Sequence, residues 1–121
     1  MAAILTVDDS ASIRQAIKIA LTSQGHQVAE ASNGAEGLSK AEAGGFALII
    51  TDLNMPVMDG LTMIRSLRAK PVGAGVPIIF LTTESDAGLK AEAKAAGATG
   101  WITKPFLPDQ LASIVKKVLA A

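Results

Sequence analysis

Phe46-Ala47-Leu48-Ile49-Ile50-Thr51-Asp52 is an almost unbroken apolar run that ends in a carboxylate. A short run of this kind, without polar alternation, is typical of a strand buried on both faces in a parallel sheet. A second run, Ile4-Leu5-Thr6-Val7, is followed directly by Asp8 and Asp9. Because the carboxyl ends of parallel strands meet at one edge of a sheet, we expect the three carboxylates to converge there.

The same alternation of apolar run and helical segment extends along the whole chain. The five runs span residues 3–7, 27–31, 46–51, 77–82 and 100–103. Helices are expected after Ser10, from Asn33-Gly34, from Gly60, over residues 86–96 and from Pro108. In the first of them, apolar residues follow at helical spacing: Ile13, Ala16, Ile17, Ala20 and Leu21. The connection at residues 71–77, rich in Pro and Gly, is predicted to lack regular structure.

This alternation predicts an α/β fold with a five-stranded parallel sheet between two helical layers, a three-layer (βα)5 sandwich, because parallel neighbours need right-handed crossovers. With 121 residues, the chain fits one domain over residues 1–121.

Lys plus Arg equals Asp plus Glu, at 11 each, so the overall charge gives no reason to expect nucleic acid or a membrane as partner. The chain has no cysteine and no export or membrane-spanning stretch, which predicts a cytoplasmic protein.

Polar residues stand at four strand ends: Asp8-Asp9, Asp52, Thr82 and Lys104. Three carboxylates in one crevice repel one another, and a hard divalent cation relieves that repulsion, so Mg2+ is the first ligand to expect. A carboxylate can attack phosphorus when a metal and a cation hold the transferring oxygens. Thr82 would then donate a hydrogen bond to one phosphoryl oxygen, and Lys104 would hold another as a point charge.

Taken together, these motifs resemble response-regulator receiver domains, and most closely the stand-alone chemotaxis regulators among them. The resemblance covers the whole chain and is carried by Val7-Asp8-Asp9-Ser10, Thr51-Asp52-Leu53-Asn54-Met55-Pro56 with Met58-Asp59-Gly60, Pro77-Ile78-Ile79-Phe80-Leu81-Thr82 and Lys104-Pro105-Phe106. It implies a flavodoxin-like fold with strand order 2-1-3-4-5.

The resemblance also implies roles for the acidic residues. Asp52 would be the phosphoacceptor, and Asp8 and Asp9 the acidic pair that binds Mg2+. The metal would touch Asp9, Asp52 and the backbone carbonyl of Asn54.

Further roles follow from the same resemblance. Thr82 would be the switch hydroxyl, and Lys104 the lysine that senses the phosphoryl group. Trp101 stands at the position of the aromatic switch residue, although a Trp there can also be a core filler. Asn54 and Glu84 occupy the two positions that tune self-dephosphorylation.

The sequence also bears on the geometry of the Lys104-Pro105 peptide and on the place of the only histidine. Base rates for X-Pro bonds favour a trans Lys104-Pro105 peptide, whereas the resemblance implies a cis bond. The lone histidine, His26, opens the second strand at the other end of the sheet and is interpreted as a surface residue, not a phosphodonor.

The expected function is that of a monomeric, phosphorylation-controlled binding module, not a metabolic enzyme. The resemblance implies a histidine kinase as phosphodonor and an output surface formed by the fourth helix, fifth strand and fifth helix, with the flagellar motor switch as target. A phosphate sink and a phosphorelay intermediate remain open as alternatives. A small phosphohydrolase with a nucleophilic aspartate fits less well, because such enzymes carry Asp-x-Asp after the first strand, and this chain has Asp8-Asp9-Ser10.

Overall fold

The computed structural model describes residues 2–53, 55–73, 75–82 and 87–120. Strands and helices alternate along the chain as predicted. The strands are β1 (Ala3–Val7), β2 (Gln27–Ala31), β3 (Leu48–Asp52), β4 (Ile78–Thr82) and β5 (Gly100–Thr103). The helices are α1 (Ala11–Thr22), α2 (Gly34–Glu42), α3 (Gly60–Arg68), α4 (Ala87–Ala95) and α5 (Pro108–Ala120).

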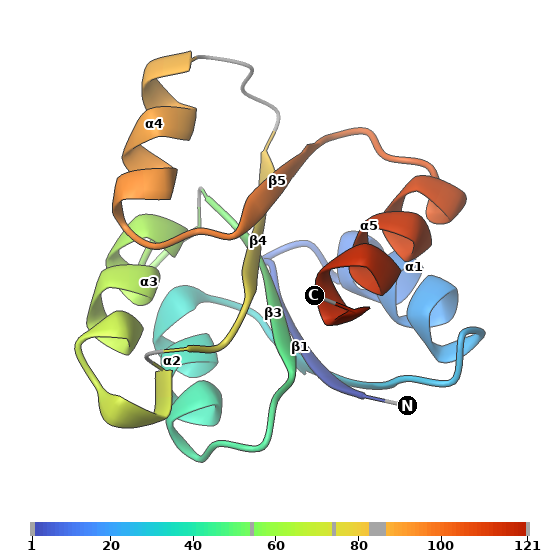
Figure 1. The fold of residues 1–121 in the computed structure, drawn as a ribbon, viewed down its shortest axis with the longest axis horizontal. Helices are drawn as coiled ribbons and strands as arrows, with labels where there is room; N and C mark the ends of the chain where they lie inside the picture. The colour runs from blue at the N-terminus through green and yellow to red at the C-terminus, as the bar shows by residue number, and fades with distance from the viewer. Residues whose placement is uncertain (1, 54, 74, 83–86, 121) are drawn as a thin grey trace.

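All four strand pairings are parallel, and the strand order is β2-β1-β3-β4-β5. Helices α1 and α5 cover one face of the sheet, and α2, α3 and α4 cover the other (Figure 1). The order reverses between β1 and β3, so the crevice at their carboxyl ends is where ligands bind in folds of this kind. The predicted fold and strand order are confirmed.

Two apolar cores lie on opposite faces of the sheet, because successive strand side chains point to opposite sides. Leu5 and Ile49 face the core under α2, α3 and α4. Ile4 and Ile50 face the core under α1 and α5. Every residue of β3 and β4 is buried, which explains why their sequences show no polar alternation.

Side-chain caps begin three of the helices. The Ser10 hydroxyl accepts a hydrogen bond from the N–H of Ile13, at 3.3 Å, and starts α1 directly after the acidic pair. Asn33 caps α2 through the N–H of Glu36, and Asp59 caps α3. The N–H of Gly60 donates to the Leu53 carbonyl at 2.9 Å, so α3 begins beside the end of β3.

One local prediction was wrong, and one residue of a predicted apolar face is exposed. Pro71–Gly73 forms a single 3₁₀ turn, closed by the N–H of Gly73 donating to the Lys70 carbonyl at 3.1 Å. Such short turns tolerate Pro at the first position, since its missing N–H would have no partner there. In α1, Ala16 is exposed, whereas Ile17, Ala20 and Leu21 are buried. A small side chain at the edge of the apolar face needs no burial.

Gly60 allows α3 to start directly against the end of β3. A Cβ atom at this position would lie 2.3 Å from the backbone oxygen of Asp52 and 2.9 Å from the ring of Phe80. We therefore expect Gly60→Ala to lower the free energy of unfolding by about 1 to 3 kcal/mol, measured by urea denaturation. Gly75→Ala is the control, because a Cβ there meets nothing within 4 Å. Equal stability of the two variants would contradict the close approach.

Among the described residues, no helix is both long enough and apolar enough to cross a membrane.

Candidate functional site

The three predicted carboxylates converge at the carboxyl edge of the sheet. Asp8 follows β1 and is fully buried, Asp9 is exposed, and Asp52 ends β3 with a side chain 12% exposed. One oxygen atom from each of the three lies within 4.8 Å of the others. The register explains this, because β1 and β3 are direct neighbours and Val7 pairs with Thr51. Asp8 and Asp52, which follow these two residues, therefore lie side by side.

Lys104 joins this cluster from the end of β5. Its Nζ lies 3.0 Å from Asp8 Oδ2 and 3.2 Å from Asp52 Oδ2, so one ammonium group bridges two carboxylates. The backbone N–H of Lys104 donates to the Thr82 carbonyl at 2.7 Å, which ties the lysine to the end of β4. The Lys104-Pro105 peptide is cis. The trans expectation from base rates was therefore wrong, and the expectation from the resemblance is confirmed.

The crowding of charge shifts two pKa values. Burial, followed by the nearby charge of Asp8, raises the pKa of Asp52, and Lys104 only partly opposes this. Burial alone would lower the pKa of Lys104, but its hydrogen bond to Asp8 and the charge of Asp52 outweigh burial and raise it. Three carboxyl groups share a single lysine in this cluster, so a bound cation would supply charge that the protein does not.

This shift predicts a pH-dependent contribution to stability. Since the pKa of Asp52 is raised in the folded state, the folded protein holds this proton at pH values where the unfolded chain has released it. The contribution of Asp52 to the free energy of unfolding is thus lost as pH rises from about 4, the ordinary aspartate pKa, through the raised value. In metal-free buffer, we expect Asp52→Asn to be more stable than the parent protein, by a margin that grows toward neutral pH. Urea denaturation in EDTA at several pH values measures this margin, and a margin independent of pH would contradict the assignment.

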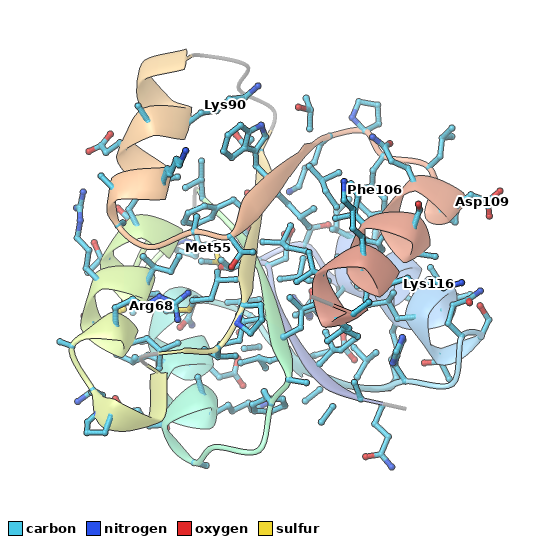
Figure 2. All side chains as sticks on the ribbon, in the orientation of Figure 1. Met55, Arg68, Lys90, Phe106, Asp109 and Lys116 are labelled. Atoms are coloured by element: carbon cyan, nitrogen blue, oxygen red, sulfur yellow. The ribbon has the colours of Figure 1, made fainter. Side chains whose placement is uncertain are left out.

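The two predicted switch residues lie on neighbouring strands. Thr82 ends β4 and is 3% exposed, close to the acidic edge. Trp101 lies on the edge strand β5, paired with Phe80, and is 37% exposed. The ammonium of Lys90, which extends from α4 toward β5 (Figure 2), lies 5.3 Å from the centre of the Trp101 ring. This is a cation–π distance. The indole is therefore not a core filler in this conformation.

Asn54 and Glu84, predicted to contribute a metal-binding carbonyl and to tune dephosphorylation, lie outside the described residues. His26 precedes β2 at the opposite end of the sheet from the carboxylates, as predicted. It is half-buried, and its Nδ1 accepts the N–H of Ala2 at 3.2 Å.

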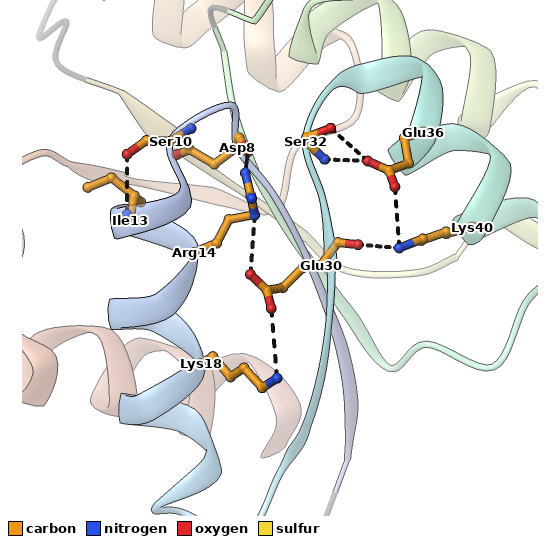
Figure 3. Close-up of polar contacts among 9 residues, drawn as sticks. All are labelled: Asp8, Ser10, Ile13, Arg14, Lys18, Glu30, Ser32, Glu36 and Lys40. Carbon is orange, nitrogen blue, oxygen red and sulfur yellow. Dashed lines mark hydrogen bonds and ion pairs between the residues drawn. The ribbon is translucent and has the colours of Figure 1, made fainter.

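A polar network beside the site was not predicted from the sequence (Figure 3). Arg14 on α1 donates through Nη1 to the backbone oxygen of Asp8 and through Nε to Glu30 Oε1, at 3.2 Å. Lys18 lies 3.7 Å from the other Glu30 oxygen, and Lys40 donates to the Glu30 backbone carbonyl. The only sequence signal was the position of Arg14 at the edge of the apolar face, between Ile13 and Ile17.

Comparison with known proteins agrees with this geometry. The response regulator receiver domain model matches residues 4–116. A chemotaxis protein CheY homolog of Campylobacter jejuni is 40% identical over 120 residues, which cover 96% of this chain and 91% of the relative. The structure of the chemotaxis response regulator CheY4 of Vibrio cholerae is 44% identical, with a TM-score of 0.93 and 98% of each chain covered.

One further structure contains a metal. The receiver domain of a sensor histidine kinase from Pseudomonas aeruginosa has a magnesium ion coordinated in its active site cleft. It is 30% identical to this chain, with a TM-score of 0.92, and the match covers 99% of this chain and 98% of that one. With the family model matched over most of its length and CheY proteins among its relatives, the chain belongs to the response regulator receiver domain family.

Proposed function

We propose that this protein is a phosphorylation-controlled switch in two-component signalling, with Asp52 as the phosphoacceptor and a histidine kinase as the phosphodonor. The observation that carries the proposal is the position of Asp52 at the end of the central strand. There it is paired with Lys104 at 3.2 Å and lies within reach of Asp8 and Asp9. We take residues 1–121 as one receiver domain that acts as a monomer in the cytoplasm.

The chemistry is the transfer of a phosphoryl group to a carboxylate. An Asp52 oxygen attacks phosphorus and forms a P–O bond while the P–N bond to the kinase imidazole breaks, and the imidazole keeps that electron pair. Lys104 then holds a phosphoryl oxygen as a point charge, and Thr82 donates its hydroxyl hydrogen to another. The protein handles only its own acyl phosphate in this way. Asn54 and Glu84 would tune the loss of that phosphate.

The donor set suits Mg2+. Oxygen ligands from three carboxylates, with only one lysine to neutralise them, match the preference of hard divalent cations. Asp8, Asp9, Asp52 and the backbone carbonyl of Asn54 would hold the ion. When bound, Mg2+ supplies positive charge that shields the attacking carboxylate from the incoming phosphoryl group.

Thr82 and Trp101 would transmit the event to the surface formed by α4, β5 and α5. When the Thr82 hydroxyl turns to donate a hydrogen bond to a phosphoryl oxygen, it leaves a space that the Trp101 indole can enter. The indole would then lose its contact with the Lys90 ammonium. Hydrogen bonds to a charged group contribute roughly 1.5 to 3 kcal/mol each, which shifts a two-state equilibrium by tenfold or more. The unphosphorylated protein therefore already visits the active surface.

Trp101 reports this switch directly, because it is the only Trp in the chain. Beryllofluoride with Mg2+, which mimics the acyl phosphate, is expected to change the emission of Trp101. Thr82→Ala is expected to reduce that change by more than half while Asp52 is still phosphorylated. Constant emission, with fluorine NMR showing an occupied site, would mean that Trp101 is not part of the switch.

The output is expected to be chemotactic, because named chemotaxis proteins are similar over nearly the whole chain. On this proposal, the target is a protein such as the flagellar motor switch, with no role for nucleic acid or membrane. Capture of binding partners with and without beryllofluoride tests it. Partners that appear only with beryllofluoride identify the output. A chain that loads phosphate but captures only the kinase would instead be a phosphate sink or a phosphorelay intermediate.

A further inference from the structure

We infer that Arg14 is a positioning residue for the metal site: its guanidinium holds the backbone carbonyl of Asp8 and thereby fixes the point and direction from which the Asp9 side chain leaves the backbone. This inference rests on the proposed function, because it concerns the Mg2+ site that Asp9 would help to form. Arg14 itself lies on α1 and would touch neither the metal nor the phosphoryl group.

Asp8 is held through every one of its polar groups. Its N–H donates to the Ala31 carbonyl at 3.0 Å, which extends the pairing of β1 with β2 by one residue. Its Oδ1 accepts the N–H of Ser10 at 2.9 Å, and its Oδ2 contacts Lys104 at 3.0 Å. The remaining group is the backbone oxygen, and Arg14 Nη1 donates to it. In a longer β2, a backbone N–H would donate to this oxygen, and Arg14 supplies that hydrogen bond instead.

Asp9, in contrast, is exposed. Within the described part of the chain, no hydrogen bond or ion pair holds its carboxylate, so the backbone fixes the Cα–Cβ bond and the side-chain torsions alone remain free. The peptide between Asp8 and Asp9 is planar, and fixing the Asp8 carbonyl therefore fixes the direction in which Asp9 leaves the strand. A binding group must be held to within about 0.5 Å of its working position, and loss of a supporting contact lowers affinity accordingly.

Arg14 is itself held in place. Its side chain is 17% exposed, and Glu30 on β2 accepts from Nε while Nη1 reaches Asp8. A planar guanidinium can span a carboxylate and a carbonyl with different nitrogens, which a single ammonium group cannot do in the same geometry. Lys18 and Lys40 also contact Glu30, so these polar contacts connect α1, β2 and α2 (Figure 3).

The two possible roles of Arg14, as a nearby positive charge and as a positioning contact, predict opposite changes in Mg2+ affinity when Arg14 is removed. A positive charge near the acidic cluster repels Mg2+, so its loss would tighten metal binding if electrostatics were its only role. Loss of a positioning contact weakens binding instead, by about tenfold to a hundredfold for groups that support metal ligands. The direction of the change therefore separates the two roles.

The test is calorimetric titration of the full chain with Mg2+. We expect Arg14→Gln to bind Mg2+ about tenfold more weakly than the parent protein. Lys18→Gln is the matched control, since it removes one positive charge from the same helix and the same Glu30 but makes no contact with Asp8. It is expected to bind as tightly as the parent or slightly more tightly. In nitrogen-15 NMR spectra of the metal-free protein, the amide signal of Asp9 is expected to move in Arg14→Gln and to stay in Lys18→Gln.

The outcomes are distinct. Parent-like or tighter binding by Arg14→Gln would overturn the inference and leave the proposed function standing, as would equal weakening in Lys18→Gln. A parent protein that binds no Mg2+ would overturn the proposed function and this inference with it. If Arg14→Gln does not fold, Arg14→Lys keeps the charge but not the double contact. Weaker Mg2+ binding by Arg14→Lys would then support the inference, and parent-like binding would overturn it.

Discussion

Asp52→Asn is expected to abolish phosphorylation of this protein by acetyl phosphate and Mg2+. The amide that replaces the carboxylate is neutral and a poor nucleophile, so no acyl phosphate can form at the end of β3. Intact-protein mass spectrometry measures the result as the presence or absence of one added phosphoryl group. The expected effect is complete loss, since no other described carboxylate is paired with Lys104 and also stands on the central strand.

The matched control is Asp59→Asn, the same substitution a few residues further along. Asp59 is exposed, and its role in the structure is to cap α3 through the N–H of Thr62, at 2.8 Å. Asn caps helices about as well as Asp, so this variant should fold and be phosphorylated like the parent protein. Phosphate on the Asp52→Asn variant would refute the assignment of the acceptor and direct attention to Asp9 or Asp8.

Asp9→Ala is expected to weaken Mg2+ binding by more than the tenfold to hundredfold that loss of a supporting contact costs, because on the proposed function it removes a direct oxygen ligand. In metal-free buffer, the same variant should be at least as stable as the parent protein, since one of three mutually repelling carboxylates is gone. Calorimetric titration with Mg2+ and thermal unfolding in EDTA measure the two effects.

Glu42→Ala serves as the control for loss of one negative charge. Glu42 ends α2 and pairs with Lys70 at 3.5 Å on the surface, so its removal should leave the affinity for Mg2+ unchanged. An Asp9→Ala variant that binds Mg2+ as tightly as the parent protein would mean that the site is formed without Asp9.

The architecture and the convergence of the carboxylates could be predicted from the sequence. Apolar runs too short for helices, each followed by a helical segment, leave a parallel sheet as the arrangement that buries them all. Since parallel strands end at one edge, the positions of Asp8, Asp9 and Asp52 directly after two such runs already bring them together. The same reasoning placed Thr82 and Lys104 at that edge and His26 away from it. These predictions depend on periodicity and chain direction alone, which local sequence encodes.

Only the tertiary structure decided which polar groups meet. Lys104 bridges Asp8 as well as Asp52, and Arg14 reaches the Asp8 carbonyl with Glu30 as its support. These contacts bridge very different separations in the chain: Arg14 and Asp8 are 6 residues apart, Arg14 and Glu30 are 16 apart, and Lys104 and Asp8 are 96 apart. A hydrogen bond forms or fails within a few tenths of an ångström, whereas a hydrophobic pattern specifies only which face of an element is buried. The packing of α1 against the sheet and the path of the chain after the edge strand β5 set those last distances, and the hydrophobic periodicity of the sequence does not carry that information.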